Sequence, residues 1–162
     1  MTGAIVEELR KRNLKVSQAI EYSGPDDPRA RQLELLSSTV GNAILRHEFW
    51  PYGRLPHRDR KSFEWTIGPG AQVLRDRYRA DYALATLVRD SYATGGRKAV
   101  MVLGILTGFS APLGSQQAYT TLVDLNTGKV VWVNLLNSET GDLRTEADAK
   151  KAVANLLKGM PL

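Results

Sequence analysis

The sequence predicts an α/β fold of the α+β kind, in which helices cover a mixed, mostly antiparallel sheet of four to five strands. One observation is a stretch with the pattern of a β-hairpin, from Tyr119 to Leu136. A second is the nearly all-apolar run Tyr82 to Val88, and a third is that amphipathic helix patterns flank both of these stretches. The chain has 162 residues. We therefore expect a single layered domain over residues 1–162.

The hairpin is predicted from two β-prone arms around a short polar connection. The arms are rich in Thr, Val, Leu, Tyr and Trp, which fit a pleated, half-buried surface. The connection Asn126-Thr127-Gly128 suits a type I turn closed by a glycine in the left-handed region. Asp124 comes just before the turn, where its carboxylate can accept backbone N–H bonds. We expect Trp132 on the second arm to be a core residue.

The other elements follow from the period of the apolar residues. An uninterrupted apolar run, such as Tyr82 to Val88, is typical of an inner strand covered on both faces. The expected strands are Leu14–Ile20, Asp81–Tyr92, Gln117–Leu125 and Lys129–Leu136. The expected helices are 2–13, 28–47, 71–79 and 145–158.

Helix starts and buried stripes are also predicted from the sequence. Asp27 before Pro28, and Thr145 with Asp148, have the pattern of helix N-caps. The helix after Pro28 is expected to bury Leu33, Leu36, Val40 and Ile44, and the helix over 71–79 to bury Val73, Leu74 and Tyr78. The last helix is expected to bury Ala149, Ala152, Val153, Leu156 and Leu157.

The segment from Ala99 to Leu113 carries no charged residue. As a helix it is too short to span a bilayer, which takes about 20 residues. Three interpretations stay open: a buried helix, a pair of strands, or an exposed apolar flap that contacts a partner or a membrane. Phe109 in this segment is a candidate contact residue.

Composition excludes some classes of chemistry. There is no cysteine, which rules out disulfides, thiolate metal sites and a cysteine nucleophile in this sequence. The net charge of +5 fits an anionic partner and an ordinary globular protein equally well. The first residues become acidic at once and lack the apolar core of a signal peptide. That favours either a cytosolic protein or a chain that is preceded by further residues, and we expect a missing N-terminal strand.

No catalytic constellation emerges from the residue types and their spacing. His47 and His57 match no zinc-binding spacing. No serine has the Gly-x-Ser-x-Gly setting of a nucleophile elbow, and no stretch has P-loop spacing. We therefore expect no catalytic residues, no metal and no cofactor, and a protein that is not an enzyme.

Two alternative functions depend on the stretch between residues 50 and 70. Basic residues there interleave with Trp50, Tyr52, Phe63 and Trp65, as they do in grooves for single-stranded nucleic acid. Those basic residues are Arg54, His57, Arg58, Arg60 and Lys61, and Arg75 to Arg79 would extend the surface. A simpler interpretation without a binding role is a loop that its aromatic side chains attach to the core. A small hydrolase or transferase site near His57, Asp59 and Glu64 is the other alternative.

Two motifs resemble a group of Gram-negative envelope proteins. Ala80 to Val88 is similar to their "Gly-Ala-Asp-Tyr-x-Leu-x-Gly-x-Val" strand, and Leu122 to Trp132 to their "Leu-x-Asp-x-x-Thr-Gly-x-Val-x-Trp" hairpin. The group includes the curli secretion channel lipoprotein, the activator lipoproteins of penicillin-binding proteins and the N-terminal domain of the Tol translocation protein. A related set of uncharacterised bacterial lipoproteins shares three further features, namely the Phe63 to Gly68 segment, the Arg97 link and a turn like Gly141 to Arg144.

The resemblance covers roughly residues 61–157 and implies a role. It implies a periplasmic, lipid-anchored protein of the outer membrane or cell envelope that acts by protein–protein contact, with other envelope proteins or with itself as a homo-oligomer. The motif residues it marks are Asp81, Tyr82, Asp124, Thr127, Gly128 and Trp132, and the candidate contact residues are Trp50, Trp65, Arg97 and Phe109. A lipoprotein also has a signal peptide and a lipid-bearing cysteine. Neither is present in this sequence, so the expectation includes a longer natural chain.

Overall fold

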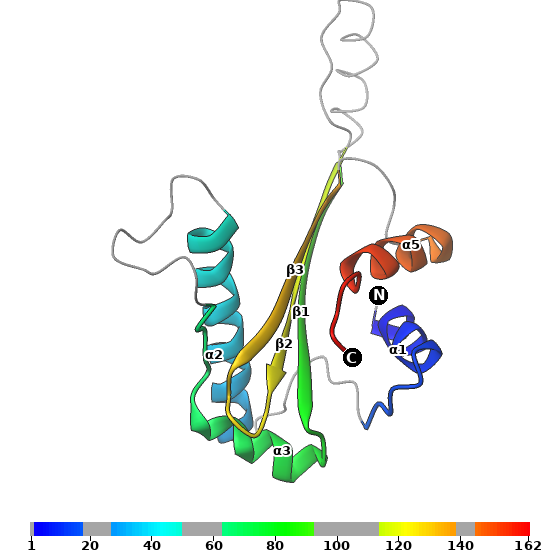
Figure 1. The fold of residues 1–162 in the computed structure, drawn as a ribbon. Coiled ribbons are helices and arrows are strands. Elements are labelled where there is room, and N and C mark those ends of the chain that lie inside the picture. Colours follow the sequence, from blue (N-terminus) through cyan, green and yellow to red (C-terminus); the bar gives the residue numbers. More distant parts are fainter. Residues whose placement is uncertain (1, 18–26, 50–62, 93–113, 139–144) are drawn as a thin grey trace, which may run out of the picture.

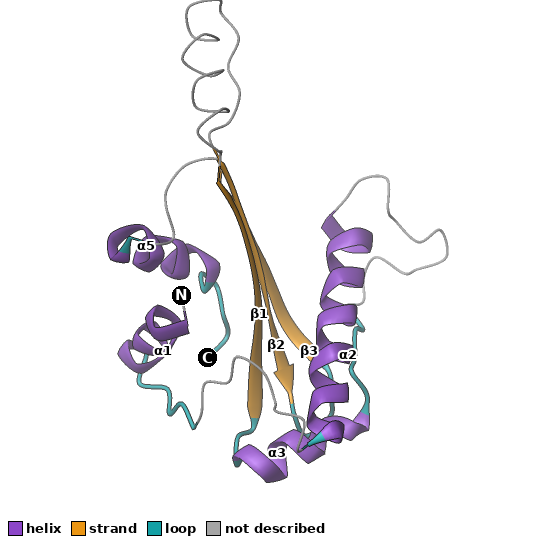
Figure 2. Cartoon of the chain, turned by 180° about the vertical axis from the view of Figure 1, so that it is seen from behind, coloured by secondary structure: helices purple, strands orange, loops and turns teal. Residues whose placement is uncertain are grey.

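The computed structural model describes residues 2–17, 27–49, 63–92, 114–138 and 145–162. Three strands form one sheet, with helices on both of its faces (Figures 1 and 2). The strands are β1 (Tyr82–Tyr92), β2 (Gly114–Asp124) and β3 (Val130–Ser138). The helices are α1 (Thr2–Lys11), α2 (Pro28–Ile44), α3 (Gln72–Tyr78) and α5 (Glu146–Leu156), with short turns of π-helix at Leu45–Phe49 and of 3-10 helix at Pro69–Ala71.

The sheet order is β1-β2-β3, and both pairs are antiparallel. β1 pairs with β2 along its whole length, from Tyr82 opposite Asp124 to Tyr92 opposite Gly114. β2 pairs with β3 up to Leu122 opposite Trp132, where a β-bulge shifts the register. The coarse α/β class is confirmed, but the expected mixed sheet of four to five strands is wrong for the described residues.

Two strand predictions need correction. Leu14 to Ser17, the described part of the expected strand Leu14–Ile20, has no regular secondary structure and pairs with no described strand. The second correction concerns β1, expected as an inner strand and found at the edge of the described sheet, where Tyr82 and Leu87 are each 43% exposed. β2 is the inner strand, although its sequence mixes polar and apolar residues and contains two buried threonines, Thr120 and Thr121.

One core lies between the sheet and the helices α2 and α3, which cover the same face. Val123 from β2 and Val130 from β3 turn toward this side. Its buried residues are Ala30, Leu33, Ile44, Ile67, Ala71, Leu74, Val123, Leu125 and Val130. α2 runs along the sheet on this side (Figures 1 and 2).

A second core lies between the opposite face of the sheet and the pair α1 and α5. Leu122, Val153, Leu157 and Met160 are its buried members. Partly buried apolar residues pack against them, among them Leu84 and Trp132 from the strands and Ile5 and Leu9 from α1. The expected buried face of α5 is confirmed in full, since all five of its predicted residues are buried.

The helix predictions are confirmed as elements and corrected in detail. Asp27 caps α2 by accepting the Ala30 N–H at 2.9 Å, and Thr145 caps α5 by accepting the Asp148 N–H at 3.3 Å. Leu36 and Val73, both expected to be buried, are 41% and 37% exposed. The spacing of apolar residues predicts which side of each helix faces the core. How many of those residues are buried depends on the neighbouring elements.

The hairpin turn has the predicted geometry. Asp124 accepts the Asn126 N–H and the Thr127 hydroxyl, both at 2.8 Å, and Gly128 has a φ of 73°. The turn also touches a segment that the sequence did not connect with it. Ile67 donates to the Gly128 carbonyl at 2.8 Å, and Val130 donates to the Trp65 carbonyl at 2.8 Å. Residues 65–67 therefore run beside the start of β3.

Candidate protein-interaction surface

A groove lies between α2 and β1, on the face of the sheet that α2 covers. Its volume is about 380 Å³, and apolar side chains make up most of its lining. Leu35 from α2 and Leu87 from β1 contribute to its walls and are 57% and 43% exposed. We call these two walls, together with the edge of β1 that pairs with no described strand, the β1–α2 surface.

The α2 wall is one stripe of a helix. Arg31, Glu34, Leu35 and Ser38 all line the groove, and they follow one another at the i, i+3, i+4, i+7 spacing of a single helical face. The buried residues Leu33 and Ile44 lie well around the helix from this stripe, nearer its opposite side, and fix α2 against the core. An arginine, a glutamate and a leucine are therefore held together on a helix whose position is set by other residues.

The β1 wall is shallow because of its small residues. Ala83 packs toward the α2-side core, and strand alternation places Ala85 and Leu87 on the same face. Two alanines in succession on this face leave space beneath α2 where larger residues would fill it. The alternation of large and small residues in the run Tyr82 to Val88 is the sequence signal that could have found this groove.

Tyr119 of β2 also lines the groove and connects the sheet to α2. Its hydroxyl donates to the Ser38 carbonyl at 3.2 Å, and its ring lies against Gly41 of α2. The residue is only 5% exposed, and burial raises the pKa of its hydroxyl, an effect that the hydrogen bond to Ser38 opposes. Tyr119 therefore acts as a neutral hydrogen-bonding support.

The outer edge of β1 pairs with no other strand among the described residues. Leu125 donates to the Asp81 carbonyl at 2.9 Å, so the main-chain groups of Asp81 face β2. Main-chain direction alternates along a strand, so the N–H and C=O groups of Tyr82, Leu84 and Thr86 point outward. A row of such groups is a template for pairing with another strand.

The motif residues marked by the resemblance lie mainly in structural positions. Asp124, Thr127 and Gly128 build the hairpin turn, and Trp132 packs on the α1/α5-side core. Asp81 precedes β1; its carboxylate lies 3.5 Å from Arg75. Tyr82 alone of this set lines the groove.

The candidate contact residues can be placed only in part. Trp50, Arg97 and Phe109 lie outside the described residues, as does the segment 99–113. Trp65 is partly buried; its indole N–H donates to Glu48 at 2.7 Å, and its ring stacks on His47 with centroids 6.3 Å apart. It therefore attaches residues 63–67 to the π-helical turn Leu45–Phe49 that follows α2.

Two of the basic residues named for the nucleic-acid alternative are in ion pairs. Arg75 is paired with Asp81, and Arg77 forms an ion pair with Asp27 at the start of α2. The basic run from Arg54 to Lys61 lies outside the described residues, and so do two members of the alternative catalytic set, His57 and Asp59. Glu64, its third member, is exposed.

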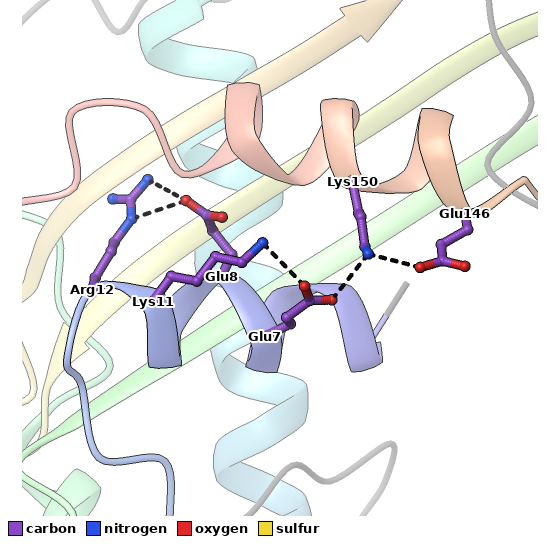
Figure 3. A network of polar contacts seen from close by, with 6 residues as sticks. All are labelled: Glu7, Glu8, Lys11, Arg12, Glu146 and Lys150. Atoms are coloured by element: carbon purple, nitrogen blue, oxygen red, sulfur yellow. Dashed lines mark hydrogen bonds and ion pairs between the residues drawn. The ribbon is translucent and has the colours of Figure 1, made fainter.

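A charged cluster on the other face is explained by helix packing. Glu7 of α1 lies 3.0 Å from Lys11 and 3.5 Å from Lys150 of α5, which also contacts Glu146 at 2.7 Å (Figure 3). The hydrogen bond from Lys11, followed by the positive charges nearby, lowers the pKa of Glu7. The contacts to Glu146 raise the pKa of Lys150. These charges join α1 to α5 and stay ionised.

Metal sites and membrane spans are both absent from the described ranges. No three histidine, aspartate or glutamate residues in them could together hold a metal ion. No described helix is both long enough and apolar enough to cross a membrane.

Comparisons with known proteins identified no relative of this chain. Models of protein families, curated proteins and solved structures were all compared with the chain, and none matched.

Proposed function

We propose that this protein is a non-catalytic binding protein that acts through contacts with other proteins at the bacterial cell envelope. The observation that carries the proposal is the β1–α2 surface. It combines an unpaired strand edge with an apolar groove and exposed leucines in the described part of the chain. Strand addition to such an edge is a common mode of protein recognition, in which main-chain bonds give affinity and neighbouring pockets give specificity.

The envelope location rests on the resemblance of two motifs, the strand from Ala80 to Val88 and the hairpin from Leu122 to Trp132. In its full-length form the protein would be periplasmic and held at a membrane by a lipid anchor. Antibodies raised against this chain should find the natural gene product in the envelope fraction of its own cells. Detection in the cytosolic fraction alone would contradict the location.

Protein contact at the β1–α2 surface can be tested in living cells with a photo-crosslinking amino acid. We expect cross-linked protein adducts from position 87 and none from position 131. Leu87 and Val131 suit this comparison because both are strand residues that are 43% exposed. Equal adduct yields from the two positions, or none from either, would contradict the proposal. The mass of an adduct separates a second copy of this chain from a different protein.

A further inference from the structure

Between Tyr82 and Val88, the outer edge of β1 lacks the features that keep strand edges from pairing; the charged residues Arg89 and Asp90 come later in the strand. Natural edges are blunted by charged residues, proline or bulges. The run from Tyr82 to Val88 contains no charged residue, no proline and no glycine, and β1 pairs with β2 without a bulge along all of its length. An edge of this kind is suited to main-chain pairing with another strand.

We infer that the strand that covers it is β1 of a second copy of this chain. The inference rests on the proposed function, because it names the first partner of the β1–α2 surface. Two copies related by a two-fold axis perpendicular to the sheet would pair β1 with β1 in an antiparallel manner and join the two sheets into one continuous sheet. Both α2 helices then lie on the same face, antiparallel and beside each other.

The position of α2 fits this arrangement. α2 contacts both β1 and β2, so its axis lies above the boundary between these strands. Neighbouring strands are about 4.8 Å apart, which puts that boundary about 5 Å from the two-fold axis. The two helix axes would therefore be about 10 Å apart, within the range for packed helices.

The position of the two-fold axis along β1 can be estimated from how α2 and β1 lie beside each other. Tyr119 pairs with Leu87 and donates to the Ser38 carbonyl, so Ser38 of α2 lies near the level of Leu87. α2 and β1 both begin at the end of the sheet near α3 (Figure 1). A helix rises about 1.5 Å per residue and a strand about 3.4 Å, which brings residues 32–33 of α2 level with residues 84–85 of β1.

That level is also where the surface is complementary to itself. Ala85 is the middle of the uncharged run from Tyr82 to Val88. On α2, Arg31 and Glu34 lie on either side of residues 32–33 and on the stripe that lines the groove. Antiparallel pairing about this level puts Arg31 of each copy opposite Glu34 of the other. Strand register and helix charge therefore point to the same axis.

The first test measures the oligomeric state by light scattering after size exclusion, at protein concentrations from about 1 to 200 µM, a range that covers micromolar association. We expect a dimer. Leu87→Lys places a charge on the edge and should shift dimerisation at least about tenfold to higher concentration. Val131→Lys adds the same charge at a strand position of equal exposure and should dimerise as the wild type does.

The second test uses the charges on α2. Arg31→Glu alone and Glu34→Arg alone each put like charges opposite each other in a dimer, so each variant should be monomeric. An equimolar mixture of the two variants should form a dimer, because every contact between positions 31 and 34 then joins a glutamate to an arginine. Recovery on mixing also shows that neither variant is merely unfolded.

The outcomes separate this inference from the proposed function. A monomeric wild type, equal dimerisation of Leu87→Lys and Val131→Lys, or failure of the charge variants to pair on mixing would each overturn the dimer. A monomer with slow amide exchange at Leu84 and Thr86 would show that the same chain covers its own edge, which overturns it as well. Cross-links from position 87 to a different protein would leave the proposed function standing in any of these cases.

Discussion

At the scale of single residues, the hairpin turn depends on Gly128. Its φ of 73° is in the left-handed region, and a Cβ added there would clash with the Gly68 carbonyl group. Gly159 has a similar φ of 77° but nothing within 4 Å of an added Cβ. A comparison of alanine substitutions at the two positions therefore separates the cost of backbone strain from the cost of a steric clash.

Gly128→Ala should lower the free energy of unfolding by clearly more than Gly159→Ala. The left-handed conformation costs an alanine about 1–2 kcal/mol at either position, and only position 128 adds a clash with backbone atoms. Urea denaturation followed by circular dichroism measures both. Equal losses in the two variants would show that the turn moves away from residue 68 at little cost.

Asp124 makes the stability of the same turn depend on pH. The hydrogen bond from the Asn126 backbone and that from the Thr127 hydroxyl hold the pKa of Asp124 below its usual value. Because the folded-state pKa is the lower one, the stabilisation is complete above the unfolded-state pKa, near 4, and is lost as pH falls through the folded-state pKa.

We expect wild-type protein and Asp124→Asn to differ most in urea midpoint at pH 7 and to converge as pH falls through the lowered pKa of Asp124 and the carboxylate becomes protonated. Asp76→Asn removes a carboxylate from an exposed position of α3 and corrects for the change in overall charge. A difference that stays constant from about pH 7 to about pH 2.5 would mean that the charge of Asp124 contributes nothing to the turn.

At the scale of elements, the contact of α2 with the sheet depends on a missing side chain. A Cβ on Gly41 would lie 2.5 Å from Cε2 of Tyr119, which is itself held by its hydrogen bond to Ser38. The sequence alone marks Gly41 only as a weak point of the helix. The structure shows that this glycine lets the ring of Tyr119 approach the helix.

Gly41→Ala should therefore destabilise the protein, although glycine to alanine inside a helix normally stabilises by up to about 1 kcal/mol. Gly3→Ala, in α1 with nothing within 4 Å, is the matched control and should be neutral or stabilising. In a Tyr119→Ala background, Gly41→Ala should lose its destabilising effect. Persistence of the loss in that background would rule out the ring contact as its cause.

At the scale of the whole molecule, the two cores lie on opposite faces of one sheet and share β2. Val123 of this strand belongs to the α2-side core, and the neighbouring Leu122 to the α1/α5-side core. Loss of packing on one face should therefore destabilise both, and the described layers should unfold together.

Trp132→Ala tests this coupling, because Trp132 packs on the α1/α5-side core while Trp65 packs on the α2-side core. We expect a loss of about 3 kcal/mol, the low end for tryptophan to alanine, since Trp132 is only partly buried. In a Trp50→Phe background, which leaves Trp65 as the remaining tryptophan, its fluorescence and the circular dichroism should shift to the same lower denaturant midpoint. Separate midpoints would show two independently unfolding layers.

Features that depend on residues close together in the chain could be predicted from the amino-acid sequence. The hairpin turn, the helix caps at Asp27 and Thr145 and the buried face of α5 were all predictable, because each follows from local hydrogen bonds or a repeat of apolar residues. The identity of the inner strand, in contrast, depends on contacts between distant parts of the chain. The run Tyr82 to Val88 has the composition of an inner strand, yet it lies at the edge of the described sheet, while the more polar β2 lies in the middle. The composition of a strand indicates how apolar its surroundings are, but it does not identify the neighbouring strands. Those neighbours come from distant parts of the chain or from another chain.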